Sequence, residues 1–447
     1  MQRWGAVRLV LSGLLTAGLI ASGATPVDAR PHRPRVSALL GPSSVAVGEP
    51  ATLSARLRPA QKGVRLLVQR RATGRWVTVA RPRTDATGRV SVRLSTATAG
   101  VQRLRVLRGS ARPTLRAASR AVTLAVMAEP GCTPRVAPVD AQATAAARCL
   151  TARLDRWQAA STMGAGQQLN VSNSEYAAPL TGLGARPVHV VGLDLKELAD
   201  SEGYGFAVRP LDYLTGLAQQ GAVLSVSWHP DNPWTGGPYN DPRPASLDQL
   251  LADTPAAAAF WADFDAGMQL FKELQDEGGA AVVFRPLHEA NGDWFWWGHP
   301  DPATYRGLWA AMQRRAAVDG VHNVLWAYSF NADTGANTSA PVALLPARVD
   351  LAGMDSYSRP GEALPTTGYA AVAAKVRRMA FTEVGPYATQ DRTWDPAAVT
   401  RAARSLAKPP LWSMFWFDDG TGVKQLSSLT RGRSWLDSCR DGFCSVG

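Results

Sequence analysis

One stretch decides the fold: residues 280–289 read AAVVFRPLHE, so that an apolar run leads directly into a histidine and a glutamate. The run at 280–284 has no polar position and is shorter than a typical helix, which indicates a strand buried on both faces of a parallel sheet. Polar groups that follow such a strand lie at its carboxyl end, where ligands bind in sheets of this kind. We therefore expect His288 and Glu289 to face a binding site.

Comparable apolar runs recur along the chain and alternate with alanine-rich stretches of helical character. Helices are predicted at 248–277, with a break, and at 302–317. Eight strands alternating with helices predict an α/β fold, a (β/α)8 TIM barrel in residues 140–447, with its chemistry at the carboxyl ends of the strands. The predicted strands are 168–170, 189–193, 222–227, 280–284, 324–327, 349–354, 378–382 and 411–417.

A second glutamate, Glu383, ends the seventh predicted strand in the run MAFTEVGP at residues 379–386. Glutamates at the ends of strands four and seven would face each other across the mouth of a barrel. Cleavage of a glycosidic bond needs one carboxylic acid on the leaving oxygen and a second carboxylate near the anomeric carbon. The competing structural interpretation is a buried Arg285–Glu289 salt bridge, with the neighbouring tryptophans as core.

Other strand ends supply polar and aromatic side chains to the same predicted face. His229 follows strand three and is expected to contact substrate or to orient the acid. Tyr357 follows strand six, where its hydroxyl could hydrogen-bond a nucleophilic carboxylate and keep the pKa of that carboxylate low. Trp416 follows strand eight and could form the floor of a sugar subsite, while Trp294 lies in the aromatic loop after Glu289.

The run RPLHEANGDWFWWG at residues 285–298 resembles glycoside hydrolase family 26, whose best-known members are endo-β-1,4-mannanases. The resemblance covers roughly residues 140–430 and implies a retaining enzyme, with Glu289 as acid/base and Glu383 as nucleophile. Many members of the family carry Met where this chain has Ala290. The resemblance also implies a set of substrate-binding residues around the two glutamates, namely His229, His288, Trp294, Tyr357 and Trp416.

The resemblance implies a secreted enzyme that hydrolyses internal bonds of a β-linked polysaccharide, with mannan as the first choice. Mixed-linkage β-1,3-1,4-glucan and β-1,3-xylan remain alternatives, because the sequence does not show which loop recognises the sugar at C2 and C5. A non-catalytic glycan-binding or adhesion protein on the same fold is the alternative from another class. No metal and no cofactor are expected, since no cysteine and histidine have metal-ligand spacing.

Residues 36–127 have a different pattern, with short alternating runs separated by glycines. Extended segments are predicted at 53–57, 64–70, 76–80, 90–94, 101–106 and 121–126, which together favour an all-β sandwich. The segment TDATGRV at residues 84–90 resembles the strand-turn-strand pattern of bacterial immunoglobulin-like modules. A linker is expected at 128–139.

Charge is distributed unevenly between the two regions. The chain has a net charge of +12, yet residues 1–130 hold 22 Lys and Arg against 4 Asp and Glu, while residues 131–447 hold 26 against 32. The basic region is either a solvated module or one that adheres to an acidic wall polymer. Nucleic acid is not expected as a partner, since few aromatics are interleaved and no known motif is present.

The N-terminus has the features of a secretory signal peptide in residues 1–29. Arg3 and Arg8 flank the start of an apolar run at 9–20, which is followed by small residues. That run is shorter than the ~20 residues that span a bilayer, so a secreted protein without a membrane partner is expected, acting as a monomer. The four cysteines then favour disulfides, and pairing of neighbours predicts Cys132–Cys149 and Cys439–Cys444.

Overall fold

The structure is a computed structural model that describes residues 33–41, 44–46, 51–72, 74–96, 100–110, 115–127, 132–170, 188–201, 208–241, 243, 246–332, 339–440 and 442–446. The predicted signal peptide at 1–29 and residues 128–131 of the predicted linker lie outside these ranges. Within them, no helix combines the length and the apolar character needed to cross a membrane.

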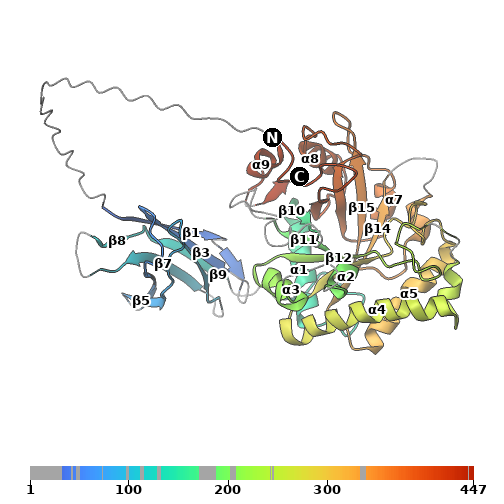
Figure 1. The fold of residues 1–447 in the computed structure, drawn as a ribbon, viewed down its shortest axis with the longest axis horizontal. Coiled ribbons are helices and arrows are strands. Elements are labelled where there is room, and N and C mark those ends of the chain that lie inside the picture. The colour runs from blue at the N-terminus through green and yellow to red at the C-terminus, as the bar shows by residue number, and fades with distance from the viewer. Residues whose placement is uncertain are drawn as a thin grey trace, which may run out of the picture.

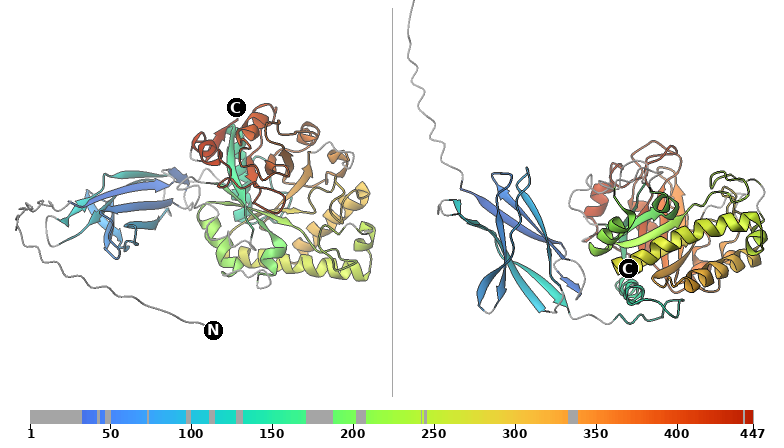
Figure 2. Two further views of the ribbon diagram at one scale, coloured as in Figure 1. Left: turned by 45° about the horizontal axis from the view of Figure 1, so that its top comes forward. Right: turned by 60° about the horizontal axis from the view of Figure 1, so that its bottom comes forward.

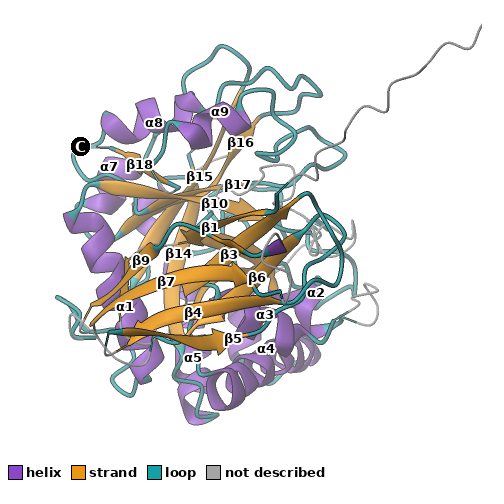
Figure 3. Ribbon diagram, turned by 90° about the vertical axis from the view of Figure 1, so that its left-hand side faces the viewer, coloured by secondary structure: helices purple, strands orange, loops and turns teal. Residues whose placement is uncertain are grey.

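The N-terminal region is the expected all-β sandwich, drawn in blue beside the barrel in Figure 1 and in front of it in Figure 3. One sheet has the order β1-β3-β6, and the other has the order β2-β9-β7-β4-β5, with β8 paired to β7. The strands are β1 (Arg35–Gly41), β2 (Ser44–Ala46), β3 (Ala51–Arg58), β4 (Leu66–Ala72), β5 (Arg75–Ala80), β6 (Arg89–Leu94), β7 (Gly100–Arg108), β8 (Ala117–Ala118) and β9 (Val122–Met127).

Alternation in the sequence determines which face of each strand is buried. In β3, Leu53 and Leu57 are fully buried, while Ser54 and Arg58, each the next residue along the strand, are exposed. The turn before β6 is held by Asp85, whose Oδ1 accepts from the backbone N–H of Thr87 and of Arg89 at 2.8 Å. Gly88 has φ +75°, and a Cβ there would lie 2.5 Å from the Leu57 carbonyl oxygen, so glycine is required at this position.

The C-terminal region is a closed barrel of eight parallel strands, which confirms the predicted fold (Figures 1 and 2). β11 to β17 follow in sequence order, and β10 pairs with both β17 and β11 to close the ring. The strands are β10 (Thr162–Gln168), β11 (Val190–Asp194), β12 (Val223–Trp228), β13 (Val282–Pro286), β14 (Val324–Asn331), β15 (Leu351–Ser358), β16 (Met379–Pro386) and β17 (Trp412–Phe415), with β18 (Phe443–Ser445) antiparallel to β10.

Helices surround the barrel and begin at recognisable caps. At α4 the Thr254 hydroxyl accepts from the Ala257 N–H, and at α5 the Asp301 carboxylate accepts from the Thr304 N–H. The described helices are α1 (Ala145–Ala159), α2 (Leu195–Ala199), α3 (Pro210–Gln219), the 3-10 helix η4 (Leu247–Leu251), α4 (Pro255–Glu273), the π-helical turn η5 (Leu274–Gly278), α5 (Pro302–Val318), α6 (Pro341–Leu344), α7 (Tyr369–Ala373), α8 (Ala397–Arg404) and α9 (Gly432–Asp437).

Seven of the eight strand predictions are confirmed, while the prediction at 168–170 is wrong for most of its length. The first strand, β10, lies earlier and has the sequence TMGAGQQ. Apart from Thr162, this run lacks the β-branched and aromatic residues that mark a strand. Its glycines are needed for close packing instead, since a Cβ on Gly164 would lie 3.3 Å from the Trp157 ring and one on Gly166 would lie 3.0 Å from Val190.

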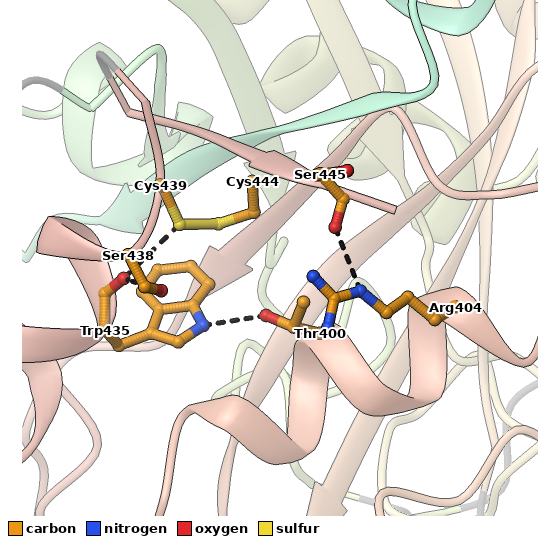
Figure 4. Close-up of a disulfide and its surroundings, with 7 residues drawn as sticks. All are labelled: Thr400, Arg404, Trp435, Ser438, Cys439, Cys444 and Ser445. Atoms are coloured by element: carbon orange, nitrogen blue, oxygen red, sulfur yellow. Dashed lines mark hydrogen bonds between the residues drawn. A yellow bond between two sulfur atoms is a disulfide. The ribbon is translucent and has the colours of Figure 1, made fainter. Parts of the chain in front are cut away.

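Both predicted disulfides are confirmed. Cys132 is bonded to Cys149 and Cys439 to Cys444, and no described cysteine is free. Figure 4 shows the second bond beside α9, where Trp435 Nε1 donates to Thr400 Oγ1 at 2.8 Å. The two bonds fasten the segment before α1 and the C-terminal β18 to the barrel.

A separate apolar cluster fills the amino-terminal end of the barrel. It joins the first residues of several strands, such as Val190, Val223 and Leu351, to Leu154 and Trp157 of α1. Helix α1 therefore closes this end. The polar strand ends are left at the opposite, carboxyl-terminal end of the barrel, as the sequence predicts.

Candidate active site

Glu289 lies in a tight turn directly after β13. Leu287 and Glu289 both have left-handed backbone angles, with φ of +46° and +52°, which residues other than glycine rarely adopt. The Glu289 N–H donates to the Ser329 carbonyl at 2.9 Å, which joins the turn to β14. Non-glycine residues in such conformations concentrate at functional sites, where the surrounding structure holds them in place.

The Glu289 carboxylate is buried, with 6% of the residue exposed, and each of its oxygens accepts a hydrogen bond from a neutral donor. Asn331 Nδ2 donates to Oε1 at 2.9 Å, and Trp294 Nε1 donates to Oε2 at 2.7 Å. Burial, followed by the charges of Asp355 and Glu383, raises the pKa of Glu289 well above its usual value. This carboxyl group therefore retains a proton at a pH where ordinary glutamates have lost theirs.

Glu383 lies in β16 and has charged and hydroxyl donors. Arg285 Nη2 donates to its Oε1, and Tyr357 Oη donates to its Oε2 at 2.7 Å. One oxygen each of Glu289, Asp355 and Glu383 lies within 4.8 Å of the others. The structure thus brings together the two glutamates that sequence analysis pairs, and Tyr357 makes the contact expected of it.

Arg285 connects Glu383 to a third carboxylate, Asp355 in β15, and all three side chains are buried. Its Nη1 donates to Asp355 Oδ2 at 2.9 Å, while Ser329 and Thr382 donate to the two Asp355 oxygens. Burial raises the pKa of Asp355 to about 7, although Arg285 opposes this rise. The alternative of an Arg285–Glu289 salt bridge is not observed, because the guanidinium pairs with Asp355 and Glu383 instead.

Glu289, Asp355 and Glu383 are also the side chains that could ligate a cation among the residues described. Arg285 already donates to two of these carboxylates and supplies the positive charge that such a cluster needs. These residues therefore fit acid–base chemistry around a guanidinium better than a three-carboxylate metal site.

Two histidines lie beside the glutamates. His288 is buried, and burial followed by the Arg285 charge lowers its pKa well below the usual value, so the ring is neutral. Its Nε2 is 3.7 Å from Glu383 Oε1. His229 packs edge-on against His288 at 4.5 Å between ring centroids, and its Nδ1 lies 2.7 Å from Asp194 Oδ2. Asp194 thereby fixes the orientation of the His229 ring.

Comparisons with known proteins identify the family of the chain. Residues 139–428, more than half of the chain, match the sequence model described as Glycosyl hydrolase family 26. The chain belongs to this family.

Among curated relatives of the family 26 chain is a mannan endo-1,4-beta-mannosidase of Bacillus subtilis strain 168, 28% identical over 234 residues, which are 48% of this chain and 62% of the relative. A mannan endo-1,4-beta-mannosidase of Bifidobacterium adolescentis is 32% identical over 151 residues, which are 32% of this chain and 15% of the relative. The alignments therefore span less than two thirds of these relatives.

Solved structures support the fold. The catalytic domain of an endo-beta-1,4-mannanase from Bacillus sp. JAMB-750 superposes with a TM-score of 0.57 at 22% identity, covering 69% of this chain and 93% of that one. A modular endo-beta-1,4-mannanase from Cellulomonas fimi gives a TM-score of 0.55 at 24% identity, covering 69% of this chain and 79% of that one.

The aromatic loop of the family 26 domain has two functions. Trp294 is half-buried and contacts Glu289, as expected of a site residue. Trp296 and Trp297 instead belong to the hydrophobic core, where their indole nitrogens donate to the Pro230 and His288 carbonyls. The competing interpretation, in which the neighbouring tryptophans are core, is therefore correct for these two. Trp416 is half-buried, 6.4 Å from His229 between ring centroids.

Two site residues, Asp194 and Asn331, are not assigned by sequence analysis. Asp194 is the last residue of the second barrel strand, β11. It also caps α2 through the Lys196 N–H, which looks like ordinary helix capping in a sequence. Asn331 ends β14, where its backbone N–H and carbonyl both bond to the Asn291 side chain, at 2.9 and 2.8 Å. The sequence signal that could have identified both residues is their position as polar residues at the ends of the second and fifth barrel strands.

Proposed function

We propose that this protein is a secreted endo-β-1,4-mannanase that cleaves mannan with retention of anomeric configuration. The observation that carries the proposal is the opposed pair Glu289 and Glu383, whose nearest oxygens lie within 4.8 Å. Retaining glycosidases hold their carboxyl groups about 5–5.5 Å apart, while inverting ones need about 6.5–9.5 Å to admit a water. The short separation supports the retaining mechanism.

In the first step Glu383 attacks the anomeric carbon while Glu289 gives its proton to the leaving oxygen. This step breaks the glycosidic bond and leaves a sugar esterified to Glu383. In the second step Glu289, now a base, takes a proton from a water molecule, which attacks the same carbon and releases Glu383. Arg285 and Tyr357 hold the Glu383 carboxylate in place through the bonds to its two oxygens.

The surroundings of Glu289 support its role as the acid. Its oxygens accept hydrogen bonds only from neutral donors, and burial raises its pKa, so that it keeps its proton at a pH where ordinary glutamates have lost theirs. His229, His288, Trp294, Tyr357 and Trp416 are the proposed substrate contacts. Aromatic faces stack on the C–H faces of sugars, and the polar groups bind hydroxyls.

The nucleophile is tested with Glu383→Ala. We expect loss of turnover with the fold retained, and partial recovery on adding azide, with a glycosyl azide of inverted configuration as product. Circular dichroism checks the fold, and NMR of the product reads the configuration. Near-normal activity of the variant without azide would remove Glu383 from the mechanism.

The acid is tested with Glu289→Ala on two kinds of substrate. An aryl glycoside with a good leaving group needs little protonation, so it should lose much less activity than mannan does. Equal losses on the two substrates would contradict the acid role while leaving the nucleophile assignment intact.

The substrate is tested by release of reducing sugar from galactomannan, glucomannan, barley β-glucan and β-1,3-xylan. Mannan is favoured because seven curated relatives carry the name mannan endo-1,4-beta-mannosidase. A β-glucanase is the second candidate, since an Endoglucanase H of Acetivibrio thermocellus is 25% identical over 159 residues. Rapid release from barley β-glucan with none from galactomannan would favour that alternative.

Secretion is part of the same proposal. The residues at 1–29 resemble a signal peptide, and both disulfides are of the kind that persists in oxidising surroundings. A monomer that contacts neither membrane nor nucleic acid is proposed. Secretion is tested by expressing the chain with residues 1–29 present and measuring activity in the culture medium. Activity retained in the cells would contradict secretion.

A further inference from the structure

The sandwich carries an extreme excess of positive charge. Residues 36–127 hold 17 Lys and Arg against two Asp and Glu, and 16 of the 17 are arginine. Of the two acidic residues, Glu49 lies outside the described residues, and Asp85 is bonded to its own turn through Thr87 and the Arg89 N–H. A hydrolase acting on a neutral polysaccharide has no need of this charge.

Four arginines gather on the outward face of the β1-β3-β6 sheet. In the antiparallel register, Arg35 of β1 lies directly opposite Arg58 of β3, and Arg56 of β3 lies directly opposite Arg89 of β6. Facing residues of this kind have Cβ atoms about 4.5–5.5 Å apart, and like charges so placed destabilise a sheet. These two pairs are therefore costly in the absence of a ligand.

The described residues offset that repulsion only in part, through the charge of Asp85 acting on Arg89. None of their carboxylates forms a salt bridge with the four arginines, and the Nε of Arg56 is buried without a hydrogen-bond partner among them. Arg35, Arg58 and Arg89 are exposed. Arg93, farther along β6, is different because its guanidinium donates to Gln219 of α3 at 2.8 Å.

Hydroxyl groups lie between the arginines on the same face. Ser37 is opposite Arg56 on the β1 side, and Ser54 is opposite Ser91 across β3 and β6. Arginine forms bidentate bonds with carboxylates and phosphates, and hydroxyls bond the sugar oxygens that separate such groups in a polymer. The outward face of this sheet thus combines anion-binding arginines with hydroxyl-bearing serines, and it also carries the exposed Leu39 of β1.

We propose that the outward face of the β1-β3-β6 sheet binds a linear acidic glycan, with Arg35, Arg56, Arg58 and Arg89 contacting its carboxylate or phosphate groups. Charge complementarity selects an anionic polymer, and a sheet of three strands offers an extended face to a chain. Nucleic acid fits less well, because the three strands contain no aromatic side chain on which a base could stack. The module would hold the enzyme on an acidic matrix while the barrel cleaves a neutral polymer.

The test compares two full-length variants of equal net charge. The face variant combines Arg35→Gln, Arg56→Gln, Arg58→Gln and Arg89→Gln. The control variant removes the same charge from four exposed arginines elsewhere in the module. These are Arg75→Gln, Arg81→Gln, Arg103→Gln and Arg120→Gln.

Binding is measured to polygalacturonate, to poly(glycerol phosphate), to neutral galactomannan and to double-stranded DNA, over a series of salt concentrations. We expect the unaltered protein to bind at least one acidic glycan-type polymer, with binding weakened about 10-fold or more in the face variant and by less than about 3-fold in the control. The two acidic probes distinguish carboxylate from phosphate as the recognised group.

Three outcomes would overturn the proposal: no binding of either acidic polymer, equal weakening in both variants, or tighter face-dependent binding of DNA. Hydrolysis of a soluble substrate should be unchanged in the face variant, which shows that the barrel is intact. Removal of like-charge pairs should leave its melting temperature the same or higher. If it falls instead, the pair Arg56→Gln and Arg89→Gln alone must still weaken binding, or the assignment fails.

Discussion

Replacement of Asn331 with alanine should shift the alkaline limb of the pH profile of kcat/KM to higher pH. The Asn331 side chain donates to Glu289 Oε1 at 2.9 Å and so stabilises the ionised carboxylate. Burial, Asp355 and Glu383 act against the ionised form. Without the amide donor, the Arg285 charge and the Trp294 bond to the other oxygen still favour the ionised form, but the opposing effects are less balanced and the pKa of Glu289 should rise further.

The size of the shift follows from the hydrogen bond that is lost. A hydrogen bond to a charged group contributes about 1.5–3 kcal/mol, and part of this persists with the neutral acid. A preference of about 1.4 kcal/mol for the ionised form corresponds to one pKa unit. The alkaline limb of kcat/KM should therefore move upward by about one pH unit, because Glu289 stays protonated to higher pH.

The assay is the pH profile of kcat/KM on a soluble oligosaccharide or on the polysaccharide that the enzyme cleaves fastest. The matched control is Gln269→Ala, which removes an amide donor to a carboxylate, Glu273, on the exposed surface of α4. Its profile should coincide with that of the unaltered enzyme. Thermal unfolding of both variants shows whether either change disturbs the fold.

A limb that stays in place, or that moves downward, would refute the reasoning in the Asn331 variant. The first result would mean that Asn331 bonds the neutral and ionised acid equally well. The second would mean that the alkaline limb belongs to another group. A general loss of rate without a shift would reduce Asn331 to a structural role at the end of β14.

Three further outcomes are expected. Tyr357→Phe removes the 2.7 Å hydrogen bond to Glu383 and should lower kcat roughly 10- to 100-fold in steady-state assays. An unchanged kcat would show that this bond does not assist catalysis. Because the folded pKa of Glu289 is raised, this group lowers stability progressively as the pH rises from its unfolded pKa to its folded pKa. Glu289→Gln should therefore raise Tm more at alkaline pH than near about pH 5, and a pH-independent difference would contradict this. Replacing both Cys132 and Cys149 with serine opens a loop with a sequence separation of 17. The free energy of unfolding, measured by urea titration, should fall by about 3 kcal/mol. A loss well below about 1 kcal/mol would contradict a stabilising role for this disulfide.

The barrel could be predicted from the sequence because most of its strands are fully buried apolar runs. β12 and β13 are buried along their whole length, and short runs of that kind are typical of strands covered on both faces. β10 could not be placed because its glycines serve close contacts with Trp157 and Val190, which exist only in the folded barrel. The local sequence pattern does not predict a strand whose residues are chosen for close contacts with neighbouring elements of the folded barrel.

The site divides along a similar line. Glu289 and Glu383 could be found because each ends a recognisable strand, and the fold brings such ends together. Asn331 also ends a strand, yet its importance depends on one hydrogen bond to a residue 42 positions away. The core position of Trp296 likewise depends on packing against Phe260 and on a bond to the Pro230 carbonyl. Contacts between distant segments cannot be read from local sequence.

The different partners of the two glutamates support their roles without reference to relatives. Glu383 accepts from the Arg285 guanidinium, and a fixed positive charge favours an ionised carboxylate, which is the form that attacks carbon. Glu289 lies within the same group of three carboxylates but accepts only from the neutral Asn331 and Trp294. An acid must hold a proton before it can donate one, and burial, followed by repulsion from Asp355 and Glu383, supplies that proton affinity. Exchanging the two roles would require the proton to lie on the carboxylate that is paired with the cation.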